Sequence, residues 1–201
     1  MDTEPAVDKM KNSFSRKDEI FKQATILFKK RGYTATSVRD LAQESGIEAP
    51  SIYSHFKSKE DILQQICFGM AKAFMTGISK AEKKKSPDDK LKAAIKAHIK
   101  VVTANSDASA VMWNEWKNLT EPYFDDFKTM IHGYETRFRK IIKKGIKAGI
   151  FKKNDPALTT TLLLSALNGL AFRLHPGKRQ VKELNSTITN IFFKGMVKRK
   201  N

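Results

Sequence analysis

The residues best suited to chemistry lie close together in the first third of the chain, and the chemistry that they support is binding. Ser51 and Tyr53 carry hydroxyl groups, His55 a ring N–H, and Lys57 and Lys59 ammonium groups. Proteins direct such donors at phosphate oxygens and at the edges of bases. For Tyr53 or His55 alone, ordinary surface packing remains an alternative. Together, the five donors point to a surface that binds nucleic acid.

The elements that must position these donors are two short helices joined by a tight turn. Ser37 followed by Asp40 has the pattern of a capping box, so a helix is expected to begin there. Gly46 suits the positive φ that often ends a helix. Pro50 suits the first turn of the next helix, because its missing N–H would have no helical partner there. This pattern is typical of a helix-turn-helix whose second helix enters the DNA major groove.

Residues 16–65 resemble the DNA-binding domain of TetR-type (TetR/AcrR) transcriptional repressors. One matching stretch is FKKRGYTATSVRDLA, which ends the first helix and begins the second. The other is ESGIEAPSIYSHFKSKEDIL, which carries the turn and the recognition helix. The resemblance covers about a quarter of the chain. The remainder is similar to the family only in its length and its all-helical pattern.

The resemblance implies DNA contacts for ten residues, some of which hold the phosphate backbone while others face bases. Ala49 stands where some family members carry a longer polar side chain, so readout there reduces to an apolar contact, such as with a thymine methyl, or is absent. Arg39 is then the best candidate for guanine. In the implied roles, Thr36, Ser37 and Lys59 contact phosphate, Arg39 enters the groove, Glu48, Ala49, Pro50 and Ser51 face bases, and Tyr53 and His55 contact the backbone.

The composition fits a soluble, intracellular protein. At 22.8 kDa the chain can bury a sizeable core. Cys67 is the single cysteine, so no internal disulfide can form, and its apolar neighbours favour packing over redox sensing. The apolar stretch around residues 162–174 is too short to span a membrane, and the N-terminus has no apolar signal core. We therefore expect a cytoplasmic location and no membrane partner.

The positive charge is concentrated away from the expected DNA-binding segment. The chain has a net charge of +17, but residues 1–57 hold 10 Lys and Arg against 8 Asp and Glu. Residues 58–201 hold 28 against 13. Two interpretations remain open. The lysines are either solvated helix faces, or they meet an anionic partner such as a phosphate-bearing acyl-coenzyme A.

The apolar spacing beyond the helix-turn-helix predicts helices throughout. The expected fold is all-α, with an N-terminal three-helix helix-turn-helix domain joined by a shared helix to a C-terminal helical ligand-binding and dimerisation domain. Residues 1–13 are expected to be a disordered tail, residues 14–60 the DNA-binding domain, and residues 61–201 the effector-binding and dimerisation domain. The longer helices are predicted over residues 16–31, 58–78, 122–148, 157–174 and 178–198. A short helix is predicted over 108–118, and an apolar stripe at helical spacing runs over 91–102.

The last two helices are apolar around most of their circumference, which predicts burial on several sides. Pairing with a second copy across a two-fold axis would supply that burial; burial within one chain is the alternative. A two-fold dimer would present two recognition helices to half-sites about one helical turn apart, or a multiple of it, in a palindromic operator. The residues predicted to form the dimer interface are Leu163, Leu167, Leu170, Ile188, Ile191 and Phe192.

Aromatic residues in the middle helices could line an effector cavity, although aromatic residues at this spacing more often belong to the plain core. The expected ligand is a small hydrophobic or anionic molecule, with an acyl-CoA-like compound as one candidate. No metal site is expected, because His98, His132 and His175 lie far apart without carboxylate neighbours. The residues predicted to line the cavity are Trp113, Trp116, Phe127, Tyr134, Phe138 and Phe172.

These observations predict a ligand-responsive, sequence-specific DNA-binding transcriptional regulator, with a small molecule releasing a repressor from its operator. The alternative is a non-specific, nucleoid-type DNA-binding protein without an effector. An enzyme is not expected, because the sequence has no Gly-rich phosphate loop, no nucleophile elbow and no cluster of metal ligands. No catalytic residue and no cofactor is therefore predicted.

Overall fold

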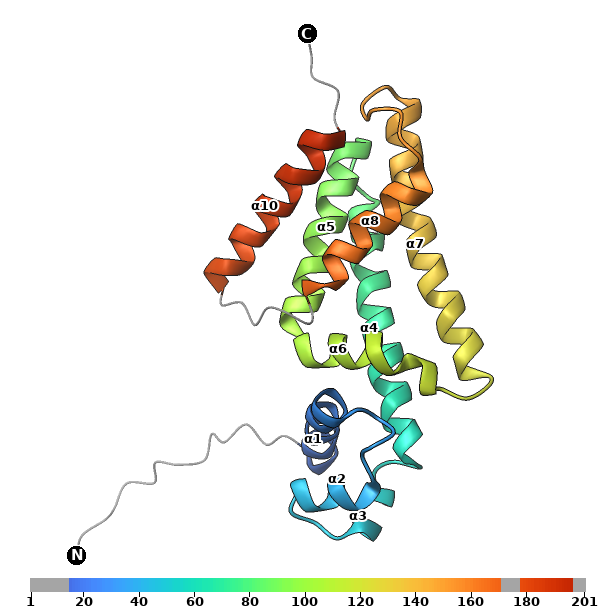
Figure 1. Cartoon of the computed structure of the whole chain (residues 1–201), viewed down its shortest axis with the longest axis vertical. Coiled ribbons are helices and arrows are strands. Elements are labelled where there is room, and N and C mark those ends of the chain that lie inside the picture. Colours follow the sequence, from blue (N-terminus) through green and yellow to red (C-terminus); the bar gives the residue numbers. More distant parts are fainter. Residues whose placement is uncertain (1–14, 171–177, 197–201) are drawn as a thin grey trace, which may run out of the picture.

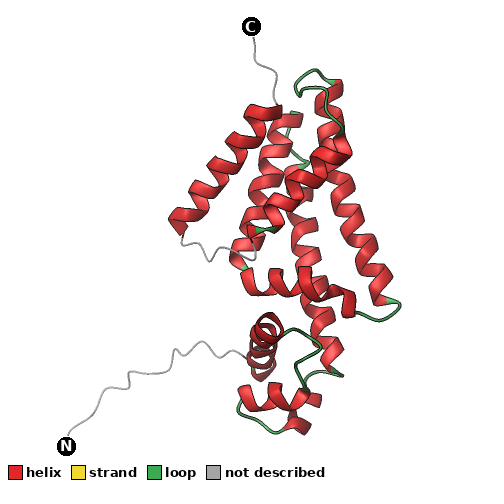
Figure 2. Ribbon diagram, viewed as in Figure 1, coloured by secondary structure: helices red, strands yellow, loops and turns green. Residues whose placement is uncertain are grey.

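The regular elements of the protein are helices, as seen in a computed structural model that describes residues 15–170 and 178–196 (Figures 1 and 2). None of the helices in these ranges is both long and apolar enough to cross a lipid bilayer. The elements are α1 (Arg16–Arg31), α2 (Val38–Glu44), α3 (Ala49–Tyr53), α4 (Lys59–Ala81), α5 (Pro87–Ala104), α6 (Ser106–Glu115), the 3₁₀ helix η1 (Trp116–Asn118), α7 (Tyr123–Lys147), α8 (Pro156–Asn168) and α10 (Lys178–Met196).

Side-chain caps set where many of the helices begin. Ser15, Ser37, Ser58, Ser86 and Asp155 each accept a hydrogen bond from the backbone N–H three residues further on. Such a cap satisfies a backbone donor that has no partner inside the helix and stabilises it by about 1 kcal/mol. The helix starts predicted at Ser37 and Ser58 are therefore confirmed.

Most helix ends match the predictions. The helix predicted over 58–78 runs on to Ala81 as α4, and two other helices also differ. The helices predicted over 16–31 and 122–148 are found within one residue of those bounds, as α1 and α7. The helix predicted over 157–174 ends earlier, at Asn168, with Gly169 as its C-cap. The helix predicted over 108–118 begins at Ser106 and finishes as the tighter helix η1. The predicted tail, residues 1–13, lies outside the described residues.

Helix α4 joins the two parts of the molecule. Its N-terminal end packs with α1, and the rest runs into a bundle with α5, α6 and α7 (Figure 1). Buried residues from Ile62 near its start to Ile78 near its end belong to one continuous apolar core. Because one rigid helix serves both parts, a displacement of the bundle can reach the N-terminal helices.

The end of the bundle furthest from α1–α3 is closed by contacts between α7, the loop 148–155 and α10. The Phe151 ring lies against Gly145, where an added Cβ would be 2.2 Å from a ring carbon. Phe151 also makes an edge contact with Phe193, at 6.1 Å between ring centroids. The backbone N–H of Lys152 donates to the carbonyl of Met196. These contacts gather the ends of α7 and α10 at one end of the molecule (Figure 1).

Two residues predicted to form a dimer interface lie inside the chain instead. Leu163 and Leu167 have no exposed surface, because α8 presents them to α7 and α5. Leu170, Ile188 and Phe192 are half-buried and pack against the core. Of the six, only Ile191 is open to solvent, at 64% exposure. The outward face of α8 carries other leucines, namely Leu158 and Leu162, which are 60% and 58% exposed.

Candidate DNA-binding surface and effector cavity

The turn between α2 and α3 has the geometry of a helix-turn-helix, a unit that spans residues 38–53. Gly46 has a φ of +64°, which favours glycine, and the N–H of Ile47 donates to the carbonyl of Ala42 at 3.0 Å. Ile52 and Phe56 are each 1% exposed and anchor α3 to the core. The predicted turn glycine and the predicted inward residues are therefore confirmed.

The outward side of the helix-turn-helix presents most of the predicted DNA-contact residues. Arg39, Glu48 and Ser51 are exposed, and Tyr53 is 56% exposed. Pro50 is also exposed. Arg39 makes no hydrogen bond or ion pair within residues 15–170 and 178–196, so its five donors face solvent. Ala49 and His55, at the edges of this surface, are half-buried.

Two residues predicted to contact phosphate have internal hydrogen bonds that compete with that role. The Thr36 side chain is 1% exposed, and its hydroxyl donates to the carbonyl of Gly32 at 2.8 Å. The prediction that Thr36 contacts phosphate is therefore wrong for its side chain. Ser37 is exposed, but its hydroxyl donates to Asp40 at 2.6 Å and accepts from the Asp40 N–H. These bonds lower the pKa of the Asp40 carboxyl.

Lys59 acts as an internal clamp in this structure. Its ammonium donates to the carbonyls of Tyr33 and Thr36 at 2.9 and 2.8 Å and lies 4.2 Å from the centroid of the Tyr33 ring. Desolvation lowers the pKa of this lysine. Because two of its three N–H groups hold the segment between α1 and α2, only one remains for the predicted phosphate contact.

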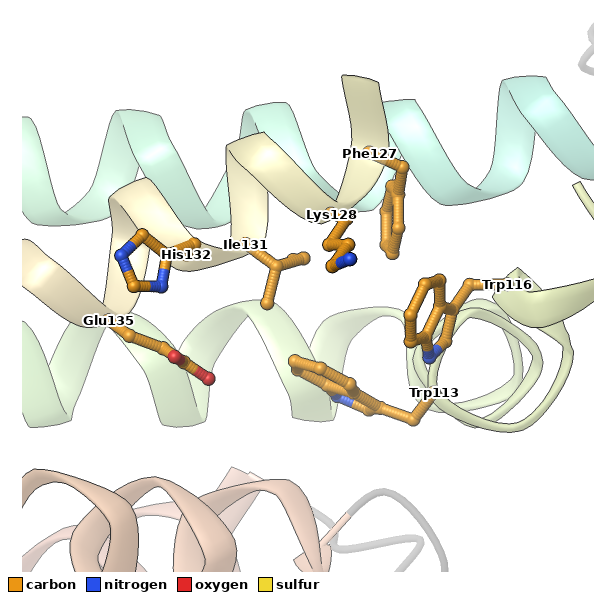
Figure 3. A pocket seen from close by; sticks show the side chains of 7 residues that line it. All are labelled: Trp113, Trp116, Phe127, Lys128, Ile131, His132 and Glu135. Atoms are coloured by element: carbon orange, nitrogen blue, oxygen red, sulfur yellow. The ribbon is translucent and has the colours of Figure 1, made fainter. Parts of the chain in front are cut away.

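The candidate effector cavity is a hollow of about 280 Å³ between η1, the end of α6 and α7. In Figure 3, Trp113 and Trp116 lie on one side and residues of α7 on the other. Of the six predicted residues, Trp113, Trp116 and Phe127 line this cavity. Four further lining residues escaped prediction, although they recur at helical spacing on one face of α7: Lys128, Ile131, His132 and Glu135.

The other predicted cavity residues do not line it. Tyr134 and Phe138 are buried in the core, at 3% and 0% exposure, and contact each other edge to face. They sit about two and three turns after Phe127 on α7, where this helix packs against α4 and α5. Phe172 lies outside the described residues. The aromatic spacing alone could not separate the cavity wall from the core.

A group of buried polar side chains lies next to the cavity. His98 Nδ1 is 3.0 Å from the Tyr134 hydroxyl, and burial lowers the pKa of His98 to about 3, against a smaller opposing effect of Asn168. Burial also raises the pKa of Tyr134. The Phe74 ring contacts His98, Tyr134 and Trp113, with centroids 4.6, 5.5 and 6.3 Å away. His98 is therefore a neutral imidazole held inside an aromatic cluster.

Two polar atoms near this cluster, Ser109 Oγ and Trp113 Nε1, are buried without a hydrogen-bond partner in the described residues. Both belong to α6, where Ser109 lies one turn before Trp113 on the same face. A buried polar atom without a partner costs about 1–3 kcal/mol, so two on one face suggest room for a polar group from outside the chain. His98 and Asn168 instead interact with each other, because a hydrogen bond from Asn168 opposes the lowering of the His98 pKa.

The wall of the cavity also touches the DNA-binding part of the chain. Lys29 on α1 forms an ion pair with Asp107 on α6 at 2.6 Å. Glu60 at the start of α4 accepts hydrogen bonds from the N–H and hydroxyl of Thr120 at 2.8 and 2.7 Å, which lowers the pKa of Glu60. The segment from α6 to Thr120 thus links the cavity to α1 and α4.

The buried cysteine Cys67 is not in a reactive environment. Burial, together with the nearby charge of Glu115, raises the pKa of the Cys67 thiol to about 12. A protonated thiol is a poor nucleophile and a poor metal ligand. Within residues 15–170 and 178–196, no group of three or more His, Cys, Asp or Glu side chains is arranged to hold a metal ion.

Comparisons with known proteins match both parts of the chain. Residues 14–66 match the family described as bacterial regulatory proteins, tetR family, and residues 84–196 match the tetracyclin repressor-like C-terminal domain. The HTH-type transcriptional repressor KstR2 of Mycolicibacterium smegmatis is 29% identical over 146 residues, covering 69% of this chain and 68% of that protein.

Solved structures agree with this fold. The TetR family regulator PfmR from Thermus thermophilus superposes with a TM-score of 0.80 at 29% identity, covering 90% of this chain and 99% of that one. AibR, solved in complex with isovaleryl coenzyme A and operator DNA, has a TM-score of 0.78 at 20% identity, covering 89% of this chain and 98% of that one; this likeness concerns the fold. With both family domains matched over the helix-turn-helix and the helical bundle, the chain belongs to the TetR family of DNA-binding transcriptional regulators.

Proposed function

We propose that the protein is a dimeric repressor that binds a palindromic operator and leaves it when a small molecule enters the cavity between α6 and α7. The observation that carries this proposal is the link between cavity and helix-turn-helix through α6 and α4. Relatives at 28–30% identity are transcriptional regulators, which favours this function over a nucleoid-type protein and over an enzyme.

For DNA binding we propose Arg39, Ser51 and Tyr53 as the principal contacts. Arg39 presents a guanidinium that can donate two hydrogen bonds to guanine O6 and N7. The short side chain of Ser51, next to Pro50 at the start of α3, lets the backbone approach base edges. Tyr53, whose ring is 56% exposed, is placed to donate to a phosphate.

For the domain division we keep residues 14–60 as the DNA-binding domain and residues 61–201 as the effector-binding and dimerisation domain. Dimerisation is proposed through the outward faces of α8 and α10. Leu158 and Leu162 are one helical turn apart and exposed, as is Ile191 on α10. Burying these side chains against a second copy would stabilise the dimer by about 1.5–3 kcal/mol for each fully buried leucine.

For the effector we propose an apolar molecule with an anionic group, of the acyl-CoA kind. Trp113, Trp116, Phe127 and Ile131 give the cavity an apolar lining, while Lys128 and His132 can donate to an anionic group. The structural relative AibR was solved with isovaleryl coenzyme A. At about 280 Å³, the cavity is below the usual size of ligand sites, so a larger ligand must push α6 and η1 away from α7.

That displacement is the proposed switch. Trp113 of α6 lines the cavity, and Asp107 of the same helix forms the ion pair with Lys29 of α1. A ligand that favours the open cavity therefore shifts α1 and α4 and changes the spacing of the two recognition helices. The expected coupling is about 1–3 kcal/mol, which weakens operator binding by a factor of about 5–150.

The test begins with selection of an operator from random DNA with the full-length protein. Arg39→Ala is then expected to weaken binding of the selected duplex by about 1–3 kcal/mol, whereas Lys22→Ala, an exposed change on α1, serves as the matched control. Equal losses in the two variants, or selection of no preferred sequence, would contradict the proposed readout.

The effector arm uses isovaleryl-CoA, acetyl-CoA and coenzyme A as probes in the same DNA-binding titration. An acyl-CoA is expected to weaken operator binding in the wild type, and Trp113→Leu is expected to reduce this response. Trp116→Phe, which keeps the aromatic wall, is the control. Binding of an acyl-CoA without any change in operator affinity would refute the proposed switch.

A further inference from the structure

The largest concentration of charge in the molecule lies at the end opposite the helix-turn-helix. The segments 80–90 and 137–155 together hold 13 Lys and Arg against 4 Asp and Glu. The excess of positive charges in these two segments is more than half of the chain's net charge of +17. Ten of these lysines are exposed, and we name them the distal lysine cap: Lys80, Lys83, Lys84, Lys85, Lys140, Lys143, Lys144, Lys147, Lys152 and Lys153.

The fold brings these two segments together. Arg137 on α7 binds Glu82, which follows α4, with its Nε donating at 3.1 Å. The nearby charges of Lys90 and Lys140 also lower the pKa of Glu82. The loop 148–155 closes against α10 through Phe151 and Lys152. The C-terminal ends of α4 and α7 therefore share one end of the bundle (Figure 1).

The cap lysines are not used to hold the fold. None of the ten forms an ion pair within residues 15–170 and 178–196. The acids in the two segments are engaged elsewhere. Glu82 pairs with Arg137, Asp88 pairs with Lys92, and Asp89 and Asp155 lie at the starts of α5 and α8. So many unpaired like charges at one end create a strong positive field that favours a polyanion.

The types of side chain in the cap indicate which kind of polyanion it binds. It offers lysine ammonium groups, which bind phosphates as point charges without reading bases. Phe151, the aromatic residue of the loop, is 1% exposed, so the described cap gives unpaired bases no ring on which to stack. Ile150 and Ile146 are half-buried, so an apolar anchor for a bilayer is also missing there. Duplex nucleic acid fits this surface best.

The cap is too far from the helix-turn-helix to serve the same site. The 23 residues of α4 separate the two ends by about 35 Å along the helix. We propose that the distal lysine cap is a second DNA-binding surface, which holds the phosphates of a separate duplex without reading its sequence. A regulator bound to its operator would then hold a second stretch of DNA at its other end.

The test is a two-duplex capture experiment with the full-length protein. The selected operator is immobilised, and retention of a labelled duplex of unrelated sequence, about 30 base pairs long, is measured at about 50 to 200 mM salt. The cap variant changes Lys140, Lys143, Lys144, Lys147 and Lys153 to Gln. The matched control removes the same charge elsewhere, at the exposed residues Lys72, Lys96, Lys100, Lys117 and Lys182.

The wild type and the control are expected to retain the second duplex, whereas the cap variant is expected to retain at least about tenfold less. The slope of log affinity against log salt should fall by about 0.9 for each phosphate that the variant no longer neutralises. Equal retention by both variants, or no retention by the wild type, would overturn the proposal. Operator capture itself is recorded for every variant, so loss of sequence readout is distinguished from loss of the second surface.

A second measurement needs no operator. The full-length wild type is acetylated with a lysine reagent in the presence and absence of the unrelated duplex, and each site is quantified by mass spectrometry. Protection of cap lysines by at least about threefold, relative to Lys72 and Lys96, is expected. Protection confined to lysines of α1–α3 and to Lys57 and Lys59 would refute the second surface.

Discussion

The helix-turn-helix and the region around the candidate effector cavity (the effector region) hold their polar groups in different ways. Around the first, Thr36, Ser37 and Lys59 are bonded to groups close by in the same domain, and Ser45 Oγ is the buried polar side-chain atom between residues 36 and 59 that has no partner among the described residues. In the second, Ser109 and Trp113 on one helix each keep such an atom. The first region is therefore largely preorganised, whereas the second gains stability when a ligand or water supplies the missing hydrogen bonds.

The largest effect is expected from removal of the aromatic centre of the effector region. Phe74→Ala deletes a side chain that is 1% exposed and contacts His98, Tyr134 and Trp113. The free energy of unfolding is expected to fall by about 3–5 kcal/mol, as measured by urea denaturation. A loss below about 1 kcal/mol would mean that the region is loosely packed already, which would sharpen the contrast with the helix-turn-helix.

Lys59→Met tests the preorganised region. The change removes the donors to the carbonyls of Tyr33 and Thr36 while keeping the length of the side chain, so a loss of about 1.5–3 kcal/mol in unfolding free energy is expected. Lys57→Met, an exposed neighbour, is the control. If Lys59→Met instead lowers operator affinity and leaves stability intact, its main role is the phosphate contact.

The pH dependence of stability tests the buried imidazole. The pKa of folded His98 is lowered to about 3 from an ordinary value near 6.5, so the unfolded state binds one more proton between these values. Stability is therefore expected to rise with pH across this window, and to fall as pH drops below 6.5, by roughly 1 kcal/mol per pH unit. In His98→Gln, the free energy of unfolding should depend less steeply on pH between about pH 4.5 and 6.5. An unchanged dependence would mean that other titrating groups cause it.

The smallest effect on stability is expected at the contact between the two regions. The ion pair of Lys29 and Asp107 is partly exposed, so Asp107→Asn should change the unfolding free energy by less than about 1 kcal/mol. The change should nevertheless weaken the effect of a bound acyl-CoA on operator affinity, measured by anisotropy. If acyl-CoA changes the operator affinity of this variant as much as that of the wild type, the coupling depends on the contact between Glu60 and Thr120 instead.

Local signals allowed the helix-turn-helix to be predicted from the sequence in detail. The capping pair Ser37 and Asp40, the positive φ of Gly46 and the inward placement of Ile52 depend on residues within a few positions of one another. The predicted bounds of α1 and α7 were confirmed for the same reason. Burial of Thr36 and the clamp made by Lys59 were missed, because both depend on how α1 and α4 meet around the loop.

What the sequence by itself determined is the set of helices, their caps and the helix-turn-helix, because these follow from periodicity and short-range hydrogen bonds. Only the tertiary structure decided which apolar residues face a cavity, the core or solvent. Phe127 and Tyr134 recur on the same helix, yet one lines the cavity and the other binds His98. Likewise, Leu163 is buried while Leu162 beside it is exposed, because the neighbouring helices, not the spacing of leucines, choose the inner face. The same packing gathers lysines from two distant segments into one cap.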